Sequence, residues 1–221
     1  MSELRKRRAD RFRKTDLYLV IGHEFTRGRS VLDVLSAAAE GGVRTVQLRE
    51  KNLSGKELTR LAEQFRKKCD ELGVLMIMND HVDVALAVGA DGVHLGQDDM
   101  PLEAARRIAP DLLLGRSTHS VEQALEAEKQ GADYVNLGPI FPTQTKNTPV
   151  HPLGLEIIRN AGPRLSIPFS VMGGVKESNI PQLLKAGARI LAMVTELTQA
   201  DDVAAKARSM RELWKMEGIC K

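Results

Sequence analysis

Residues 87–96, AVGADGVHLG, hold the pattern that decides the fold: the end of an apolar helix, a glycine and then a short apolar strand. The pattern returns in KQGADYVNLG (129–138) and KAGARILAMV (185–194). Glycine directly after a helical stretch is typical of a helix C-terminus. A run of Val, Leu and Ile without alternating polar residues is typical of a parallel strand that is covered on both faces. The repeat therefore predicts consecutive βα units.

The same rhythm extends over most of the 221 residues. Ser54 and Glu57 have the spacing of a helix-capping box, and Gly73 stands where that helix is expected to end. Eight βα units in one chain of this length predict a single-domain α/β fold, a (β/α)₈ TIM barrel over residues 15–221. An open dinucleotide-binding sheet is disfavoured, because residues 21–26, IGHEFT, lack the G-x-G-x-x-G turn. The predicted strands are residues 17–21, 43–48, 74–78, 92–95, 112–115, 134–137, 169–172 and 190–194.

Composition narrows the class of protein further. With 43% hydrophobic and 28% charged residues, the chain is globular and not intrinsically disordered. Its two cysteines, Cys69 and Cys220, form no metal-binding pattern and fit a reducing compartment. The apolar runs are too short to span a bilayer, so we expect a cytoplasmic protein without a membrane anchor.

The basic charge is concentrated at the N-terminus. Residues 1–14 hold seven Lys and Arg against Glu3 and Asp10, a local net charge of +5, whereas the whole chain carries +3. The remaining body is therefore slightly acidic and lacks the basic, aromatic-rich surface of a nucleic-acid-binding protein. We expect residues 1–14 to form a solvated, frayed leader.

Polar residues gather where the predicted strands end, which in a barrel is the active-site mouth. Gln47, Arg49 and Lys51 occupy alternate positions and would point to one side of their strand. Arg and Lys together suit a phosphate or diphosphate. The sequence shows no motif for a catalytic nucleophile, so covalent catalysis is not expected. The alternative is an exposed strand end that pairs with Glu50 or other acids.

Two further pairs of residues leave alternatives open. Asp80 and Asp99, from neighbouring strands, suit Mg²⁺, but either could instead cap a helix. Gly173 and Gly174 precede a helix in the loop where barrels often bind phosphate, but a tight turn could also require them.

Several strings, in this order, resemble the thiamine-phosphate synthase family: VQLREK (46–51), MND (78–80), GADGVHLGQDD (89–99), LGRSTHS (114–120), GADYVNLGPIFPTQTK (131–146) and IPFSVMGGV (167–175). The resemblance implies a transferase that joins an aminopyrimidine diphosphate to a thiazole phosphate, with loss of CO₂ when the thiazole carries a carboxylate. It implies Mg²⁺ on Asp80 and Asp99. It also implies a set of substrate-binding residues, of which Arg49, Lys51, Ser117 and Lys146 would carry the catalysis: Gln47, Leu48, Arg49, Glu50, Lys51, Asn79, Ser117, Thr143, Gln144, Thr145, Lys146, Gly174, Val194 and Thr195.

Three departures from the family pattern are expected to alter the thiazole-phosphate pocket: Arg189-Ile190 after Gly187-Ala188, Thr195 in place of Ser, and the large Met172. The nearest alternative function is a thiazole tautomerase on the same barrel, which would not need the cations and carboxylates. A non-catalytic sensor of phosphorylated ligands is a second alternative, and an RNA or membrane contact through residues 1–14 is a third. The partners would be small phosphorylated substrates, and the sequence leaves open whether the chain is a monomer or a homodimer.

Overall fold

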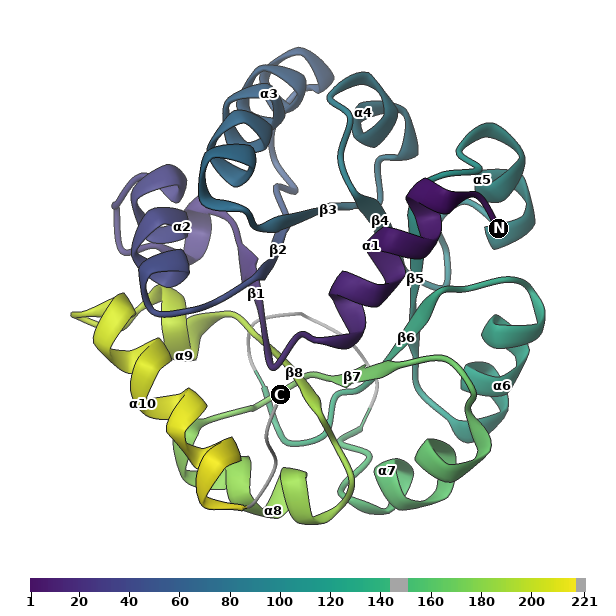
Figure 1. The fold of residues 1–221 in the computed structure, drawn as a ribbon, viewed down its shortest axis with the longest axis vertical. Helices are drawn as coiled ribbons and strands as arrows, with labels where there is room; N and C mark the ends of the chain where they lie inside the picture. The colour runs from purple at the N-terminus through teal and green to yellow at the C-terminus, as the bar shows by residue number, and fades with distance from the viewer. Residues whose placement is uncertain (144–150, 218–221) are drawn as a thin grey trace.

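A computed structural model describes residues 1–143 and 151–217. It confirms the barrel: the eight parallel strands follow one another around a closed sheet, and β8 pairs with β1 (Figure 1). The strands are β1 (Leu17–Ile21), β2 (Thr45–Leu48), β3 (Leu75–Asn79), β4 (Gly92–Leu95), β5 (Leu113–Thr118), β6 (Tyr134–Leu137), β7 (Phe169–Val171) and β8 (Ile190–Met193).

Helices surround the strands on the outside of the barrel (Figure 1). The ring is made of α2 (Val31–Glu40), α3 (Gly55–Leu72), α4 (Val82–Ala87), α5 (Leu102–Ile108), α6 (Val121–Lys129), α7 (Glu156–Ala161), α8 (Ile180–Lys185), α9 (Thr195–Thr198) and α10 (Val203–Met216). The capping box of Ser54 and Glu57 opens α3, and Gly73 ends it in a left-handed conformation with φ 65°, as predicted.

Each strand is buried on two sides. One apolar layer fills the space between the strands and the outer helices, and a second, smaller cluster fills the inside of the barrel. The inner cluster contains Phe12, Tyr18 and Tyr134 together with aliphatic residues of several strands. Burial on both faces is the reason that the strands lack a regular apolar and polar alternation.

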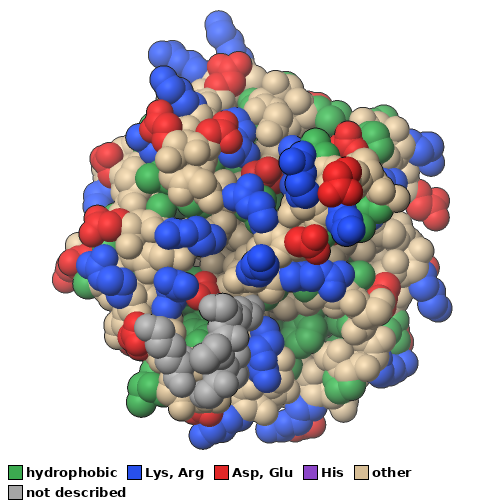
Figure 2. Space-filling view, viewed as in Figure 1, with side chains coloured by type: hydrophobic (Ala, Val, Ile, Leu, Met, Phe, Trp, Pro, Cys, Tyr) green, Lys and Arg blue, Asp and Glu red, His purple; other side chains and the backbone are tan. Residues whose placement is uncertain are grey.

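Residues 1–14 are not a frayed leader, and this expectation is wrong. They form helix α1 (Glu3–Arg13), which lies across the end of the barrel at which the strands begin (Figure 1). Phe12, only 1% exposed, enters the inner apolar cluster. The space-filling view of this face shows basic and acidic side chains intermixed (Figure 2). The positive charge of the segment is thus partly used in contacts with the barrel.

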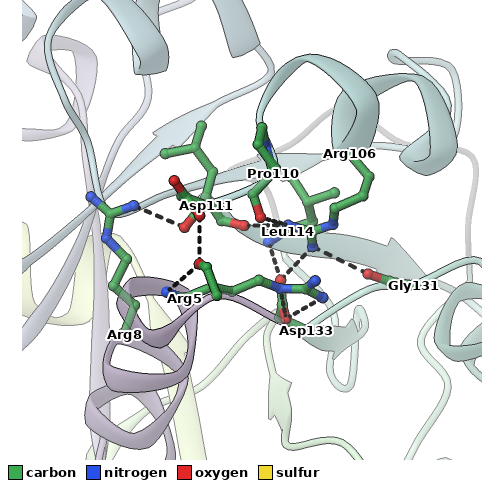
Figure 3. A network of polar contacts seen from close by, with 10 residues as sticks. Arg5, Arg8, Arg106, Pro110, Asp111, Leu114, Gly131 and Asp133 are labelled. Atoms are coloured by element: carbon green, nitrogen blue, oxygen red, sulfur yellow. Dashed lines mark hydrogen bonds and ion pairs between the residues drawn. The ribbon is translucent and has the colours of Figure 1, made fainter.

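Ion pairs hold α1 in place (Figure 3). Arg5 contacts the Asp133 carboxylate at 2.8 Å, and Arg8 contacts Asp91 at 3.3 Å. Arg8 also donates to the Asp111 carbonyl oxygen. Every helix within the described parts of the chain is too short or too polar to span a membrane.

Candidate active site

A cavity of about 820 Å³ opens at the end of the barrel where the strands finish. Its walls come from the segments that follow β1, β2, β5, β6, β7 and β8, together with residues in the strands themselves. The structure therefore brings together, in one mouth, eight of the sixteen predicted site residues: Gln47, Arg49, Asn79, Ser117, Thr143, Gly174, Val194 and Thr195.

Arg49 and Lys51 lie in the segment after β2, which ends at Leu48, and not on the strand as the predicted alternation required. Arg49 lines both the large cavity and an adjoining pocket of about 350 Å³, which Lys51 also lines. Within the described parts of the chain, Glu50 pairs with neither of them: its carboxylate accepts hydrogen bonds from the backbone and ring nitrogens of His23, at 2.8 and 2.7 Å, whereas Lys51 pairs with another acid, Asp80. Leu48 is fully buried in the outer apolar layer, so its side chain does not reach the mouth.

Asp80 and Asp99 meet at the edge of this basic region. Their carboxyl groups share a hydrogen bond, and Lys51 donates a second hydrogen bond to Asp80. Neither side chain caps the following helix: the N-cap residues are His81 and Pro101. The helix-capping alternative is thereby excluded.

The pKa values of the two carboxyl groups are shifted in opposite directions. Burial raises the pKa of Asp99, and the hydrogen bond with Asp80 raises it further. Burial acts in the same direction on Asp80, but the hydrogen bonds from Lys51 and Asp99 outweigh it and lower its pKa. Two adjacent carboxylates compete for one proton unless a cation neutralises them. Asp80 also has a left-handed backbone, with φ 61°, a strained conformation that is frequent at functional sites.

On the opposite wall, Gly173 and Gly174 form the loop after β7. Both have positive φ angles, 97° and 62°, and a Cβ on Gly174 would lie 2.6 Å from the carbonyl oxygen of Pro142. The turn therefore requires both glycines for structural reasons. Among the described residues, the backbone amides of Gly174, Val175 and Thr195 donate no hydrogen bond, which leaves them suited to an anion.

The family model described as thiamine monophosphate synthase matches residues 17–197 of the chain. The chain belongs to this family. A thiamine-phosphate synthase of Shouchella clausii is 45% identical over 195 residues, which are 88% of this chain and 93% of that protein. One of Caldicellulosiruptor saccharolyticus is 40% identical over 216 residues, 97% and 98% of the two chains. The solved structure of thiamine phosphate pyrophosphorylase from Pyrococcus furiosus has a TM-score of 0.85 at 36% identity and covers 94% of this chain and 98% of that one.

Two of the three departures from the pattern of the thiamine monophosphate synthase family lie where they can affect ligands. Met172 and Thr195 line the cavity. The third expectation is wrong, because Arg189 and Ile190 lie where β8 begins, at the closed end of the barrel. Arg189 donates to the carbonyl oxygens of Leu184 and Ala188, and Ile190 belongs to the inner apolar cluster.

Sequence reasoning left other lining residues unassigned. His94 and Asn136 each interrupt an apolar strand, GVHL and YVNL, with a polar side chain that lines the cavity. That interruption is the signal by which they could have been found. Three predicted site residues, Gln144, Thr145 and Lys146, lie outside the described residues.

Proposed function

We propose that the chain acts as a thiamine-phosphate synthase, which couples 4-amino-2-methyl-5-hydroxymethylpyrimidine diphosphate to a thiazole phosphate. The products are thiamine phosphate and diphosphate, and CO₂ where the thiazole carries a carboxylate. One observation carries the proposal: the cavity has Arg49 on one wall and a glycine loop with available amides on the other, and Lys51, which lines the adjoining pocket with Arg49, bonds to the carboxyl pair through Asp80. This arrangement suits two phosphorylated ligands that must meet.

The chemistry is a substitution at the pyrimidine methylene carbon. The bond from this carbon to the diphosphate oxygen breaks, and its electron pair leaves with the diphosphate. The lone pair of the thiazole nitrogen then forms the new carbon–nitrogen bond. A dissociative step of this kind requires stabilisation of the departing anion and alignment of two partners, not a protein nucleophile.

The described residues divide between these two tasks. Arg49 and Lys51 would bind the diphosphate and stabilise the charge that develops on it. Gln47, Asn79 and Ser117 would hold the pyrimidine, and the first two are almost completely buried, which fixes their side chains. Lys146 remains the predicted second contact to the leaving group. Thr143, Gly174, Val194 and Thr195 would hold the thiazole phosphate, with Gln144 and Thr145 as further predicted contacts.

The carboxyl pair fits Mg²⁺. Asp80 and Asp99 provide two oxygen ligands side by side, and hydrated Mg²⁺ is commonly held by one or two carboxylates and by substrate phosphates. Bound there, the ion would supply positive charge to the diphosphate. Lys51 would keep Asp80 ionised and ready to bind it.

A tautomerase would have no use for the group formed by Lys51, Asp80 and Asp99, so the arrangement favours coupling. We assign the reaction to the cytoplasm, because the cysteine usage fits a reducing compartment. The ligands are small phosphorylated molecules, with no role for nucleic acid.

The test is to mix the purified chain with both phosphorylated substrates and to measure thiamine phosphate, with Mg²⁺ and with Mg²⁺ chelated. We expect product only when Mg²⁺ is present. Tight binding of the pyrimidine diphosphate without product would identify a sensor instead. Isomerisation of the thiazole phosphate alone would identify a tautomerase.

A further inference from the structure

A chain of hydrogen bonds crosses the barrel at the bottom of the cavity; all of them are buried except the last, to Ser117, which is partly buried. The Gln47 amide nitrogen donates to the Tyr18 hydroxyl at 2.6 Å, and this hydroxyl lies 3.0 Å from that of Tyr134. The Tyr134 hydroxyl is 3.1 Å from His94 Nδ1, and His94 Nε2 is 2.9 Å from the Ser117 hydroxyl. Five side chains from five different strands thus connect two predicted substrate-binding residues, Gln47 and Ser117, across the barrel.

The interior of the barrel is shaped around this chain. Tyr18 and Tyr134 are 1% and 0% exposed. Gly115 of β5 makes room for the Tyr134 ring, since a Cβ there would lie 2.1 Å from its Cζ and 2.3 Å from its hydroxyl oxygen. From below, the Phe12 ring packs against Tyr134 with centroids 4.1 Å apart and against Tyr18 at 5.8 Å. Helix α1 therefore supports the tyrosine pair directly.

Starting from the Gln47 donor, one assignment of the protons gives every hydrogen bond of the chain a donor and an acceptor. Gln47 donates to Tyr18, so the Tyr18 proton is available for Tyr134, and the Tyr134 proton for His94 Nδ1. A neutral imidazole then carries its proton on Nε2 and donates to the Ser117 oxygen. Burial raises the pKa of both tyrosines, so both keep their protons. With this assignment the Ser117 hydroxyl accepts from His94, and its own hydrogen is free to be donated to a ligand when one binds in the cavity.

We propose that Tyr18, Tyr134 and His94 are positioning residues that fix the orientation of Gln47 and Ser117, with Phe12 of α1 holding the tyrosines from below. This inference rests on the proposed function, since Gln47 and Ser117 act on its substrates. It assigns a catalytic purpose to a polar network in the barrel core and to the N-terminal helix.

The test compares Tyr134→Phe with a matched control, Thr45→Val. Tyr134→Phe keeps the ring and removes the hydroxyl that links Tyr18 to His94. Thr45→Val also removes a buried hydroxyl, at the start of β2 and outside the network. This hydroxyl lies 2.6 Å from that of Thr15. Both variants should unfold at a somewhat lower temperature, but only Tyr134→Phe should lower kcat, by roughly 10-fold to 100-fold, as a misplaced catalytic group does.

A double-mutant cycle separates positioning from general loosening of the core. In a Ser117→Ala background, Tyr134→Phe should lower kcat by less than about 2-fold further, because its effect passes through Ser117. Thr45→Val should have the same effect on unfolding temperature in either background. An unchanged kcat in Tyr134→Phe, or a loss that multiplies fully with that of Ser117→Ala, would overturn the inference.

Crystal structures of the wild type and Tyr134→Phe give an answer that does not depend on activity. We expect the Ser117 or Gln47 side chain to change its orientation in the variant, and identical orientations would overturn the inference. A wild-type chain that forms no thiamine phosphate would instead refute the proposed function, while the two crystal structures would still decide whether the network positions these side chains.

Discussion

The two ends of the barrel use the same kinds of charged residue in opposite ways. At the closed end, Asp91 accepts a hydrogen bond from the Met76 amide at 2.9 Å and pairs with Arg66 at 2.7 Å. Asp133 likewise accepts from the Leu114 amide at 2.8 Å and pairs with Arg106 at 2.6 Å. At the open end, the carboxyl groups of Asp80 and Asp99 face each other. At the closed end each of these carboxylates is paired with an arginine, whereas at the open end, among the described residues, Lys51 pairs with Asp80 alone and Asp99 accepts only from the Gly96 amide and shares a hydrogen bond with Asp80.

This contrast changes the meaning of a repeated motif. The Gly-Ala-Asp strings at 89–91 and 131–133 lead into β4 and β6, so their aspartates lie at the closed end and tie neighbouring strands together. Residues at the start of barrel strands serve stability, and those at the end serve chemistry. In the corresponding string at 187–189, Gly-Ala-Arg, Arg189 takes the place of the aspartate. This difference therefore affects the closed end and not the phosphate pocket.

The largest expected effect comes from removing residues 1–14. Loss of Phe12 alone should cost about 3–5 kcal/mol of unfolding free energy, as for other buried aromatic residues. The deletion also removes Arg5 and Arg8 from Asp133 and Asp91. We expect the unfolding temperature to fall by roughly 10 °C or more, measured by circular dichroism.

The control for this deletion is Arg7→Ala, an exposed position on the same helix, which should leave the unfolding temperature nearly unchanged. An undiminished unfolding temperature in the deletion would mean that α1 does not stabilise the closed end.

At the open end, Arg49→Ala should act on turnover and not on folding. Removing one group that stabilises charge in the transition state costs roughly 100-fold to 1,000-fold in kcat. The unfolding temperature should change by no more than about 2 °C, because Arg49 lines a cavity. Steady-state assays of thiamine phosphate formation measure the first quantity. Arg27→Ala, which breaks an exposed ion pair with Asp201, is the control and should alter neither. Full activity in Arg49→Ala would contradict the diphosphate site.

Asp99→Asn tests the metal site. In the wild type, the Gly96 amide donates a hydrogen bond to Asp99 Oδ2 at 2.6 Å. The variant keeps an oxygen that can accept this bond but removes the negative charge. We expect the Mg²⁺ concentration for half-maximal rate to rise by at least about 10-fold, the smallest loss typical of altered metal surroundings. Asp98→Asn, next in the chain, is the control. An unchanged Mg²⁺ requirement in Asp99→Asn would remove Asp99 from the ligand set.

The comparison of the two ends also shows how far sequence reasoning reaches. Strands were predictable because burial on two faces leaves a local signal. β5 was predicted to end at Gly115 but continues to Thr118, since its last residues face the mouth and are polar. Helix α1 was missed because its partners, Asp91, Asp111 and Asp133, lie far along the chain. The network of Tyr18, Tyr134 and His94 depends on strand register around the barrel, which no local pattern encodes.

The smallest effect concerns Cys69, which reports on how well the helix layer near the closed end is packed. This thiol is fully buried in α3, and burial raises its pKa to about 12. In a Cys220→Ser variant, the native protein should therefore resist alkylation at pH 8, while the unfolded protein reacts at once.

The same thiol should make stability depend on pH. Above pH 9.0, the ordinary pKa of the thiol, Cys69 ionises in the unfolded chain before it does so in the folded one. Stability should thus decline as the pH rises from 9 toward 12, while it should be unaffected by this thiol at neutral pH. Cys69→Ala should remove this thiol's share of the decline. Rapid alkylation of the native chain at pH 8, at a rate far above that of global unfolding, would show that this layer opens locally and is less tightly packed than its burial implies.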